Sequence, residues 1–252
     1  MKVIVTNNYE EMSKIAAKEI AKLLYVKPEA VLGLATGSTP EGVYKELVEL
    51  NKEHRVDFSK AMSYNLDEYK GLKGDHPQSY RYFMDTNLFN HVNIDKRKTH
   101  VPNGVAEDIE KECKEYDEAI EKAGGIDLQL LGIGGNGHIG FNEPSDYLDL
   151  NTHLTSLTED TIKANSRFFD CIEEVPTEAI TMGLGSIMKA KKIILLASGT
   201  KKAEIISKLV EDKISTRVPA SILQVHPDVL VIVDKEAASL LKNSSNNEIE
   251  YI

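Results

Sequence analysis

A single histidine, His138, stands among glycines in the segment from Gly132 to Pro144, directly after an apolar run that we expect to be a strand. Histidine is the side chain whose unperturbed pKa lets it gain and lose a proton near neutral pH. Glycines let a backbone fold closely around a small ligand. Glu143 could hold the His138 ring, as a carboxylate does in a catalytic triad. The segment therefore indicates a proton-transfer site, although a lone histidine is more often structural.

The same segment fits the dinucleotide-binding pattern G-x-G-x-x-G at Gly132, Gly134 and Gly137. In that pattern a long helix begins at the last glycine. Gly140 and Pro144 would interrupt such a helix, so we reject the dinucleotide interpretation.

Two adjacent carboxylates, Asp67 and Glu68, follow the apolar run 61–66, which we expect to be a strand. A general base must lie within hydrogen-bond reach of the proton that it removes. Asp67 can therefore act as a base only if the fold presses it against a ligand. A solvated turn is the alternative, and it is the commoner one for a carboxylate pair of unknown placement.

An anion site is indicated by the segment 35–40, between a predicted strand and a predicted helix. Gly37 lets the backbone turn, Pro40 suits the first helical position, and Ser38 or Thr39 suits the cap. Free N–H groups at a helix start, together with two hydroxyls, would bind an anion. An ordinary capped helix explains the same residues equally well.

An anionic ligand would also need basic side chains, since the chain as a whole is acidic. The candidates are Arg167 and Lys202, the latter next to Lys201 between another predicted strand and helix. A cation there adds charge to the positive end of the helix dipole. For one of the two lysines, a solvated helix start is the simpler explanation.

The elements that must position these residues follow from the hydrophobic pattern. Short apolar runs, typical of buried parallel strands, alternate with amphipathic helical stretches. We expect a helix over 40–50 and strands over 1–5, 31–35, 61–66, 127–133, 192–197 and 229–233. This alternation predicts an α/β fold with a doubly wound, mostly parallel, Rossmann-like sheet flanked by helices. Ligands bind such sheets at the carboxyl ends of the strands.

Length and composition limit the class of protein. The chain has 252 residues, a hydrophobic fraction of 41% and a formal net charge of −10. These values fit one domain and disfavour broad contact with nucleic acid or anionic membranes. No apolar run approaches the roughly 20 residues that span a bilayer, and the N-terminal run is too short for a signal peptide. We expect a single domain over 1–242 and a polar tail over 243–252.

Cysteine use indicates the compartment. The chain has only Cys113 and Cys171, and their spacing suggests neither a metal site nor a disulfide framework. A reducing compartment is the simplest interpretation, so we expect a cytoplasmic protein.

Four blocks of sequence carry a resemblance to a known family. They are Thr-Gly-Ser-Thr-Pro at 36–40, Asn-Leu-Asp-Glu-Tyr at 65–69, Gly-His-Ile-Gly-Phe-Asn-Glu-Pro at 137–144 and Ala-Asn-Ser-Arg-Phe-Phe at 164–169. In this order they resemble the glucosamine-6-phosphate deaminases, also called isomerases, and the likeness extends to about residue 234. It implies an enzyme that converts glucosamine 6-phosphate and water to fructose 6-phosphate and ammonia, without a metal or an organic cofactor.

The resemblance also implies which residues bind the phosphate of the substrate. They are Gly37, Ser38, Thr39, Arg167 and Lys202. A phosphate held far from the reacting carbons would supply binding energy that positions the sugar.

Catalytic roles are likewise implied by the resemblance. His138 would open the pyranose ring, Glu143 would orient His138, and Asp67 would carry a proton from C2 to C1. Many family members have Asp where this chain has Asn136. Because an amide cannot take up a proton, Asn136 is expected only to orient its neighbours.

Two other functions are weighed against this one. A 6-phosphogluconolactonase would share the fold and the phosphate site, but it hydrolyses a lactone and moves no C2 proton. A sugar-phosphate-sensing module of a transcription regulator would need a DNA-binding domain. The acidic chain has no spare helix-turn-helix segment before residue 31.

Regulation can also be predicted by resemblance. Longer family members form hexamers that N-acetylglucosamine 6-phosphate activates, and basic residues shortly after the Asn-Glu-Pro motif hold the effector phosphate. In this chain the stretch 145–155 contains no Lys or Arg. We therefore expect hyperbolic kinetics without such activation, and a monomer or small homo-oligomer.

Overall fold

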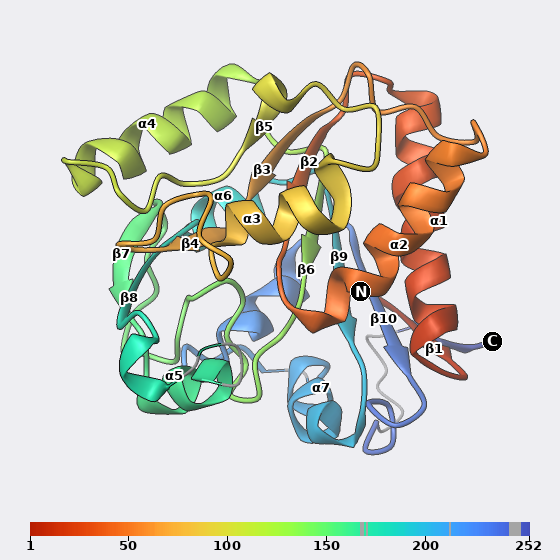
Figure 1. Cartoon of the computed structure of the whole chain (residues 1–252). Helices are drawn as coiled ribbons and strands as arrows, with labels where there is room; N and C mark the ends of the chain where they lie inside the picture. The colour runs from red at the N-terminus through yellow and green to blue at the C-terminus, as the bar shows by residue number, and fades with distance from the viewer. Residues whose placement is uncertain (167–168, 170, 212, 242–247) are drawn as a thin grey trace.

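The computed structural model describes residues 1–252 except 167–168, 170, 212 and 242–247 (Figure 1). Within the described part of the chain, eight strands form one sheet in which all neighbours are parallel. Their spatial order is β11 (Glu248–Tyr251), β1 (Lys2–Thr6), β10 (Val229–Asp234), β9 (Lys192–Ala197), β6 (Leu128–Leu131), β2 (Val31–Leu34), β3 (Met62–Asn65) and β5 (Thr99–His100). The predicted parallel α/β sheet is confirmed.

Helices cover both faces of this sheet, because successive side chains of a strand point to opposite faces. Leu32 and Leu34 of β2 pack in the core under α1 (Tyr9–Val26), α2 (Ser38–Lys52) and α3 (Tyr80–Met84), and Leu88 and Phe89 of the π-helical turn Asp85–Phe89 join them. Val31 of β2 belongs to the core on the other face, with α4 (Ile109–Lys122), α6 (Leu184–Met188) and α7 (Ala203–Leu209). Figure 1 shows α1 and α2 on one side of the strands and α4 on the other. The sheet is therefore doubly wound, as predicted.

A second, three-stranded sheet was not predicted. In it, β8 (Glu178–Thr181) pairs antiparallel with β4 (Asp67–Tyr69) on one side and β7 (His153–Ser156) on the other. Leu66 joins the two sheets, since its N–H donates to Leu34 and its carbonyl accepts from Met182. These strands have three or four residues each, which is too short for a clear alternation of polar and apolar residues.

Several predicted boundaries differ from the structure. The strand expected over 127–133 ends at Leu131. The helix expected to begin at Pro40 begins at Ser38, and proline is tolerated there because the first-turn N–H groups have no partner within the helix. Residues 248–251, assigned from the sequence to a polar tail, form the edge strand β11. Ile249 packs against the core and anchors that strand.

The order of the strands locates a site for ligands. The chain leaves β2 towards β3 on one side and leaves β6 towards β9 on the other side. Crevices open at such a reversal, outside the carboxyl ends of the strands. Apart from Arg167, the predicted site residues follow β9, β6, β2 and β3, which are consecutive neighbours in the sheet.

The remaining described elements are short. They are α5 (Glu159–Asn165), which lies beside β7 and β8 in Figure 1, and 3₁₀ turns at Lys96–Lys98, Ile172–Glu174, Thr200–Lys202 and Pro219–Val225. None of the described helices is both long and apolar enough to cross a membrane.

Candidate active site

Asp67 is the first residue of β4 and lies at the junction of the two sheets. Its residue surface is only 6% exposed, and no hydrogen bond between described residues ends on its carboxylate. Burial, and to a smaller extent the nearby Glu68 charge, raise the pKa of Asp67 to about 8. A carboxylate with this pKa is a stronger base than an exposed aspartate and is suited to take up a proton near neutral pH.

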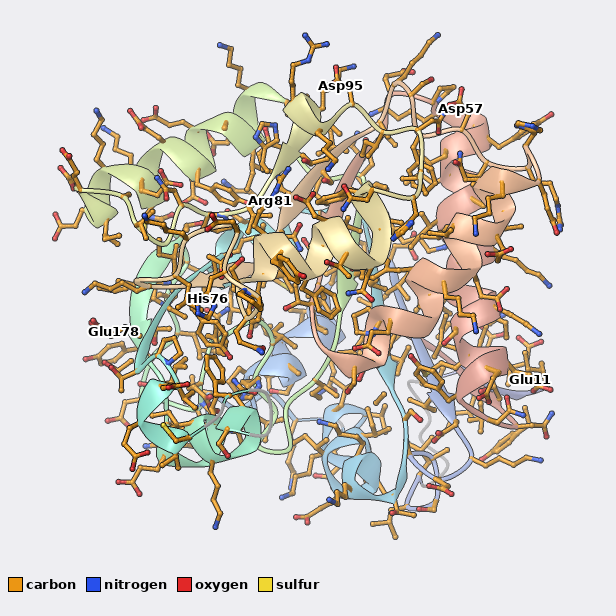
Figure 2. The ribbon with its side chains drawn as sticks, viewed as in Figure 1. Glu11, Asp57, His76, Arg81, Asp95 and Glu178 are labelled. Carbon is orange, nitrogen blue, oxygen red and sulfur yellow. The ribbon has the colours of Figure 1, made fainter. Side chains whose placement is uncertain are left out.

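The neighbouring Glu68 has a different role, because adjacent residues of a strand point to opposite faces. Its carboxylate accepts hydrogen bonds from the backbone N–H groups of Tyr69, Tyr80 and Arg81 at 2.9, 2.9 and 3.0 Å. Figure 2 labels Arg81 in the first turn of α3. Burial raises the pKa of Glu68 to about 7, although the three N–H groups lower it. The Glu68 carboxylate is thus engaged by backbone N–H groups at the start of α3. Asp67 is the carboxylate that is available for chemistry.

The glycine-rich loop after β6 approaches Asp67 at Gly140. Gly140 has a φ of +60°, and a Cβ there would lie 2.8 Å from Thr181 Oγ1 and 3.6 Å from Asp67 Oδ2. Thr181 is also the residue opposite Asp67 in the β4–β8 pair, and its hydroxyl accepts a hydrogen bond from Phe141 N at 3.0 Å. The loop that carries His138 is therefore held against Asp67.

His138 and Glu143 lie together in this loop, as predicted. Nδ1 of His138 is 3.2 Å from Glu143 Oε1, although the ring is not aligned for a full hydrogen bond. Asn136 links the two, because its Nδ2 donates to Glu143 Oε2 at 2.6 Å and its Oδ1 accepts from His138 N at 3.2 Å. Asn136 thus fixes both the carboxylate and the backbone of the histidine.

Glu143 is held ionised by its neighbours. Burial opposes its ionisation, but the His138 contact and the hydrogen bonds from Thr161 and Asn136 outweigh burial and lower the pKa of Glu143 to about 2. Thr161 Oγ1 donates to Glu143 Oε1 at 2.5 Å. A carboxylate that stays charged beside an imidazole can orient it and stabilise its protonated form.

The position of the His138 ring depends on the absence of a side chain at residue 134. A Cβ on Gly134 would lie 2.3 Å from His138 Cε1 and 2.4 Å from Nε2. The Gly134 N–H also donates to the His138 carbonyl at 2.9 Å. The ring therefore lies directly over the backbone of its own loop, which explains the glycine at position 134.

The predicted anion loop contains the backbone N–H groups at the start of α2. Gly37 is the N-cap of α2 with a φ of +96°, and neither Ser38 nor Thr39 caps the helix, contrary to the prediction, because both residues already lie within it. Tyr9 Oη braces the loop by contacting the carbonyls of Ser38 and Thr39 at 3.0 and 3.1 Å. Because the N-cap is a glycine, it has no side chain that competes for the first-turn N–H groups, and N–H groups at a helix start can donate to an anion.

Lys202 is the predicted basic residue that the structure brings to the site. Its Nζ donates to the carbonyl of Ile133 at 2.6 Å, at the start of the glycine-rich loop, whereas Lys201 is exposed. Gly199 precedes this turn with a φ of +89°. The other predicted phosphate ligand, Arg167, lies outside the described residues.

Sequence reasoning missed the groups that support the glycine-rich loop from outside. Ala220 N donates to the Gly137 carbonyl at 2.8 Å, and a Cβ on Gly137 would lie 2.8 Å from Val218 Cγ1. Thr161 contacts Glu143 from α5. Glycine at 137 was a visible signal for close packing, but the sequence did not reveal its partner.

The sequence of the chain matches a known protein family. The model of the family described as glucosamine-6-phosphate isomerases and 6-phosphogluconolactonases matches residues 6–232. The chain belongs to this family. The match includes every predicted site residue and all strands of the large sheet except β11, with β1 and β10 entering it in part.

Relatives within the family share most of the sequence. A glucosamine-6-phosphate deaminase of Thermoanaerobacter pseudethanolicus is 62% identical over 252 residues, which is 100% of both chains. One from Clostridium perfringens strain 13 is 63% identical over 242 residues, covering 96% of this chain and 100% of its own.

Solved structures of the family have the same fold. A monomeric glucosamine-6-phosphate deaminase superposes with a TM-score of 0.93 at 48% identity, covering 95% of this chain and 100% of its own. A 6-phosphogluconolactonase from Trypanosoma cruzi has a TM-score of 0.75 at 20% identity, with 96% and 97% covered. At that identity the lactonase supports the fold alone.

Proposed function

We propose that this family member is a glucosamine-6-phosphate deaminase, which converts glucosamine 6-phosphate and water to fructose 6-phosphate and ammonia. The observation that carries the proposal is the buried base Asp67 next to the loop that holds His138 and Glu143. Lactone hydrolysis needs no base that moves a C2 proton. The names of relatives at 62% and 63% identity agree with the deaminase.

Substrate binding would begin at the phosphate. The N–H groups at the start of α2, the hydroxyls of Ser38 and Thr39, and the ammonium of Lys202 offer complementary charge. We propose that Arg167, which follows α5 in the sequence, supplies the remaining positive charge. An arginine binds a phosphate through two parallel hydrogen bonds and so fixes its orientation.

Ring opening is the first chemical step in the proposal. His138 moves a proton between the anomeric hydroxyl and the ring oxygen, which breaks the bond between C1 and that oxygen and yields the open-chain aldehyde. Glu143 is ionised and 3.2 Å from Nδ1, so it stabilises the protonated ring while the proton is in transit. Asn136 orients both groups, since an amide cannot accept the proton itself.

Isomerisation and deamination follow from the open-chain form. Asp67 removes the proton from C2, and the aldehyde oxygen takes up a proton, which gives an enolamine. Asp67 then returns its proton to C1 while the nitrogen gives up one proton. The resulting imine at C2 adds water, and the C–N bond breaks to release ammonia and leave a ketone. One carboxylate that reaches both carbons is sufficient for this transfer.

The experiment that tests the function is an ammonia assay with purified protein. Glucosamine 6-phosphate should release ammonia, whereas N-acetylglucosamine 6-phosphate should release none. Lactone hydrolysis of 6-phosphogluconolactone should remain at the uncatalysed rate. Lactonase activity without ammonia release would contradict the proposal, and binding of glucosamine 6-phosphate without turnover would support a sensing module instead.

The assembly and compartment belong to the same proposal. We infer a monomer or small homo-oligomer, in line with the monomeric deaminase that this chain resembles at 48% identity. Cys113 and Cys171 are both unbonded, which suits the reducing cytoplasm.

Activation by a sugar-phosphate effector is not expected. Next to the 145–155 stretch, a cavity of about 530 Å³ lies between α4 and β7. Its charged lining includes the carboxylates of Glu110, Asp117, Glu118 and Glu121 and the ammonium of Lys114. Arg217 reaches Asp146 and neutralises one charge of that stretch, a contact that the sequence did not suggest. Lys114 pairs with Glu118 at 3.7 Å, but the carboxylates of the cavity outnumber this lysine and would still repel a dianionic effector.

A further inference from the structure

Helix α5 contacts the candidate site at two points on one face. Thr161 is 6% exposed, and its Oγ1 donates to Glu143 Oε1 at 2.5 Å. Asn165 Nδ2 donates to Tyr69 Oη at 2.8 Å, and Tyr69 belongs to the same short strand as Asp67. Residues four apart lie on the same side of a helix. One face of α5 therefore reaches both the glycine-rich loop and the strand that carries the base.

The cap of α5 orients the Thr161 hydroxyl. Thr158 is the N-cap, and its Oγ1 accepts from Thr161 N at 3.3 Å. The same Oγ1 is 3.0 Å from Thr161 Oγ1 and donates to it. Because that contact uses a lone pair of Thr161, the Thr161 proton remains for Glu143. The direction of this hydrogen bond is thus set by the start of the helix.

The oxygen that Thr161 holds is the one that faces the histidine. His138 Nδ1 lies 3.2 Å from Glu143 Oε1, and Thr161 donates to the same Oε1. The other oxygen, Oε2, accepts from Asn136 at 2.6 Å. Thr158 Oγ1 also contacts Oε1, but at 3.5 Å. Loss of the Thr161 hydroxyl would therefore leave Oε1 with only this long contact from α5, while Oε2 stays held by Asn136.

We propose that Thr161 is a positioning residue for the ring-opening step, acting from α5 by holding Glu143 Oε1 against His138. Asn165 secures the helix in the position from which Thr161 can do so. This inference rests on the proposed deaminase function, since it assigns Thr161 to one step of that reaction.

The test compares Thr161→Val, which keeps the shape but removes the hydroxyl, with Thr161→Ser, which restores it. Thr155→Val is the matched control, because the Thr155 hydroxyl contacts only the Ser156 carbonyl at 3.4 Å in the described part of the chain. Each variant is assayed for ammonia release from glucosamine 6-phosphate and from its 5-deoxy analogue. The analogue has no C5 hydroxyl and so cannot close to a pyranose.

The expected result is selective for the closed sugar. Thr161→Val should lower kcat on glucosamine 6-phosphate by roughly 10-fold, the loss expected for one hydrogen bond to a charged group, with KM nearly unchanged. Its rate on the 5-deoxy analogue should stay within about 2-fold of wild type, because hydrogen bonds elsewhere are kept. Thr161→Ser should recover most of the lost rate, and Thr155→Val should behave as wild type.

Two results would overturn the inference. Wild-type kcat in Thr161→Val would show that the hydroxyl is dispensable. An equal loss on both substrates that Thr161→Ser does not recover would show that residue 161 acts only in folding or in a later step. Failure of the proposed function is distinguishable, because the wild-type protein itself would then release no ammonia from glucosamine 6-phosphate.

Discussion

Replacing the buried Asp67, the proposed base, should stabilise the protein while it removes activity. Asp67 is 6% exposed, and burial raises its pKa from 3.8 to about 8. Each pH unit between the pKa values of the folded and unfolded states corresponds to about 1.4 kcal/mol. Holding Asp67 ionised in the folded state therefore costs about 5 to 6 kcal/mol above pH 8. Asp67→Asn removes that cost with little change in shape.

The size of the stability gain depends on pH. The folded protein binds the Asp67 proton more tightly than the unfolded chain, so the destabilisation develops as pH rises from about 4 to about 8 and is constant above it. The side-chain amide of the variant would be buried without a hydrogen-bond partner, which lowers the free energy of unfolding by about 1 to 3 kcal/mol. Asp67→Asn should thus gain about 3 kcal/mol at pH 8.5 and almost nothing at pH 5.

Urea unfolding of the wild type and the variant at both pH values measures this difference. Asp75→Asn, in an exposed position, removes the same formal charge and should change stability little at either pH. Deuterium uptake at C2 should fall about 10²-fold or more in Asp67→Asn, because the amide cannot accept the proton. A stability difference that is the same at pH 5 and pH 8.5 would refute the reasoning, and so would a variant that is less stable at pH 8.5.

Four further outcomes are expected. His138→Ala should reduce turnover of glucosamine 6-phosphate far more than turnover of the 5-deoxy analogue, and equal losses would assign His138 to another step. Arg167→Ala should raise KM steeply because the phosphate loses a bidentate partner, and an unchanged KM would remove Arg167 from the site. The value of kcat/KM should rise with pH up to about 8 as Asp67 ionises, and a flat profile from pH 6 to 9 would count against Asp67 as the base. Saturation curves should be hyperbolic and unaffected by N-acetylglucosamine 6-phosphate, so a sigmoidal curve that this compound makes hyperbolic would contradict the expectation for 145–155.

Most of the fold could be predicted because each central strand is recognisable from its own few residues. The central strands are continuous apolar runs, and parallel strands buried on both faces require such runs. Their carboxyl ends then located the candidate loops. The small sheet was not predictable, since β4, for example, pairs with a strand more than 100 residues away and its own three residues carry no periodic signal.

The residues of the candidate site could be predicted from the sequence, but the contacts that they make could not. Asp67 and Glu68 could not be told apart from sequence, because the difference lies in the start of α3, whose N–H groups hold Glu68. Thr161 carried no signal at all, since threonine is common near helix starts. The assignment of Ser38 or Thr39 as a cap was wrong because local capping rules do not show where tertiary contacts begin the helix.

The adjacency of Asp67 and Glu68 makes the spacing between the two sheets intolerant of insertions and deletions. One carboxylate must lie on the side of Gly140 and the other must face the start of α3. A shift of one residue along β4 moves every side chain of the strand to the opposite face, so a single inserted or deleted codon at Leu66 would exchange the faces on which the two carboxylates lie. Such a change would turn the longer glutamate towards the glycine-rich loop and the shorter aspartate towards the helix start, so one change would impair both the proposed catalysis and folding. The exposed segment 73–77 has no such constraint, and a library of length variants should therefore retain active members there and lose them at residue 66.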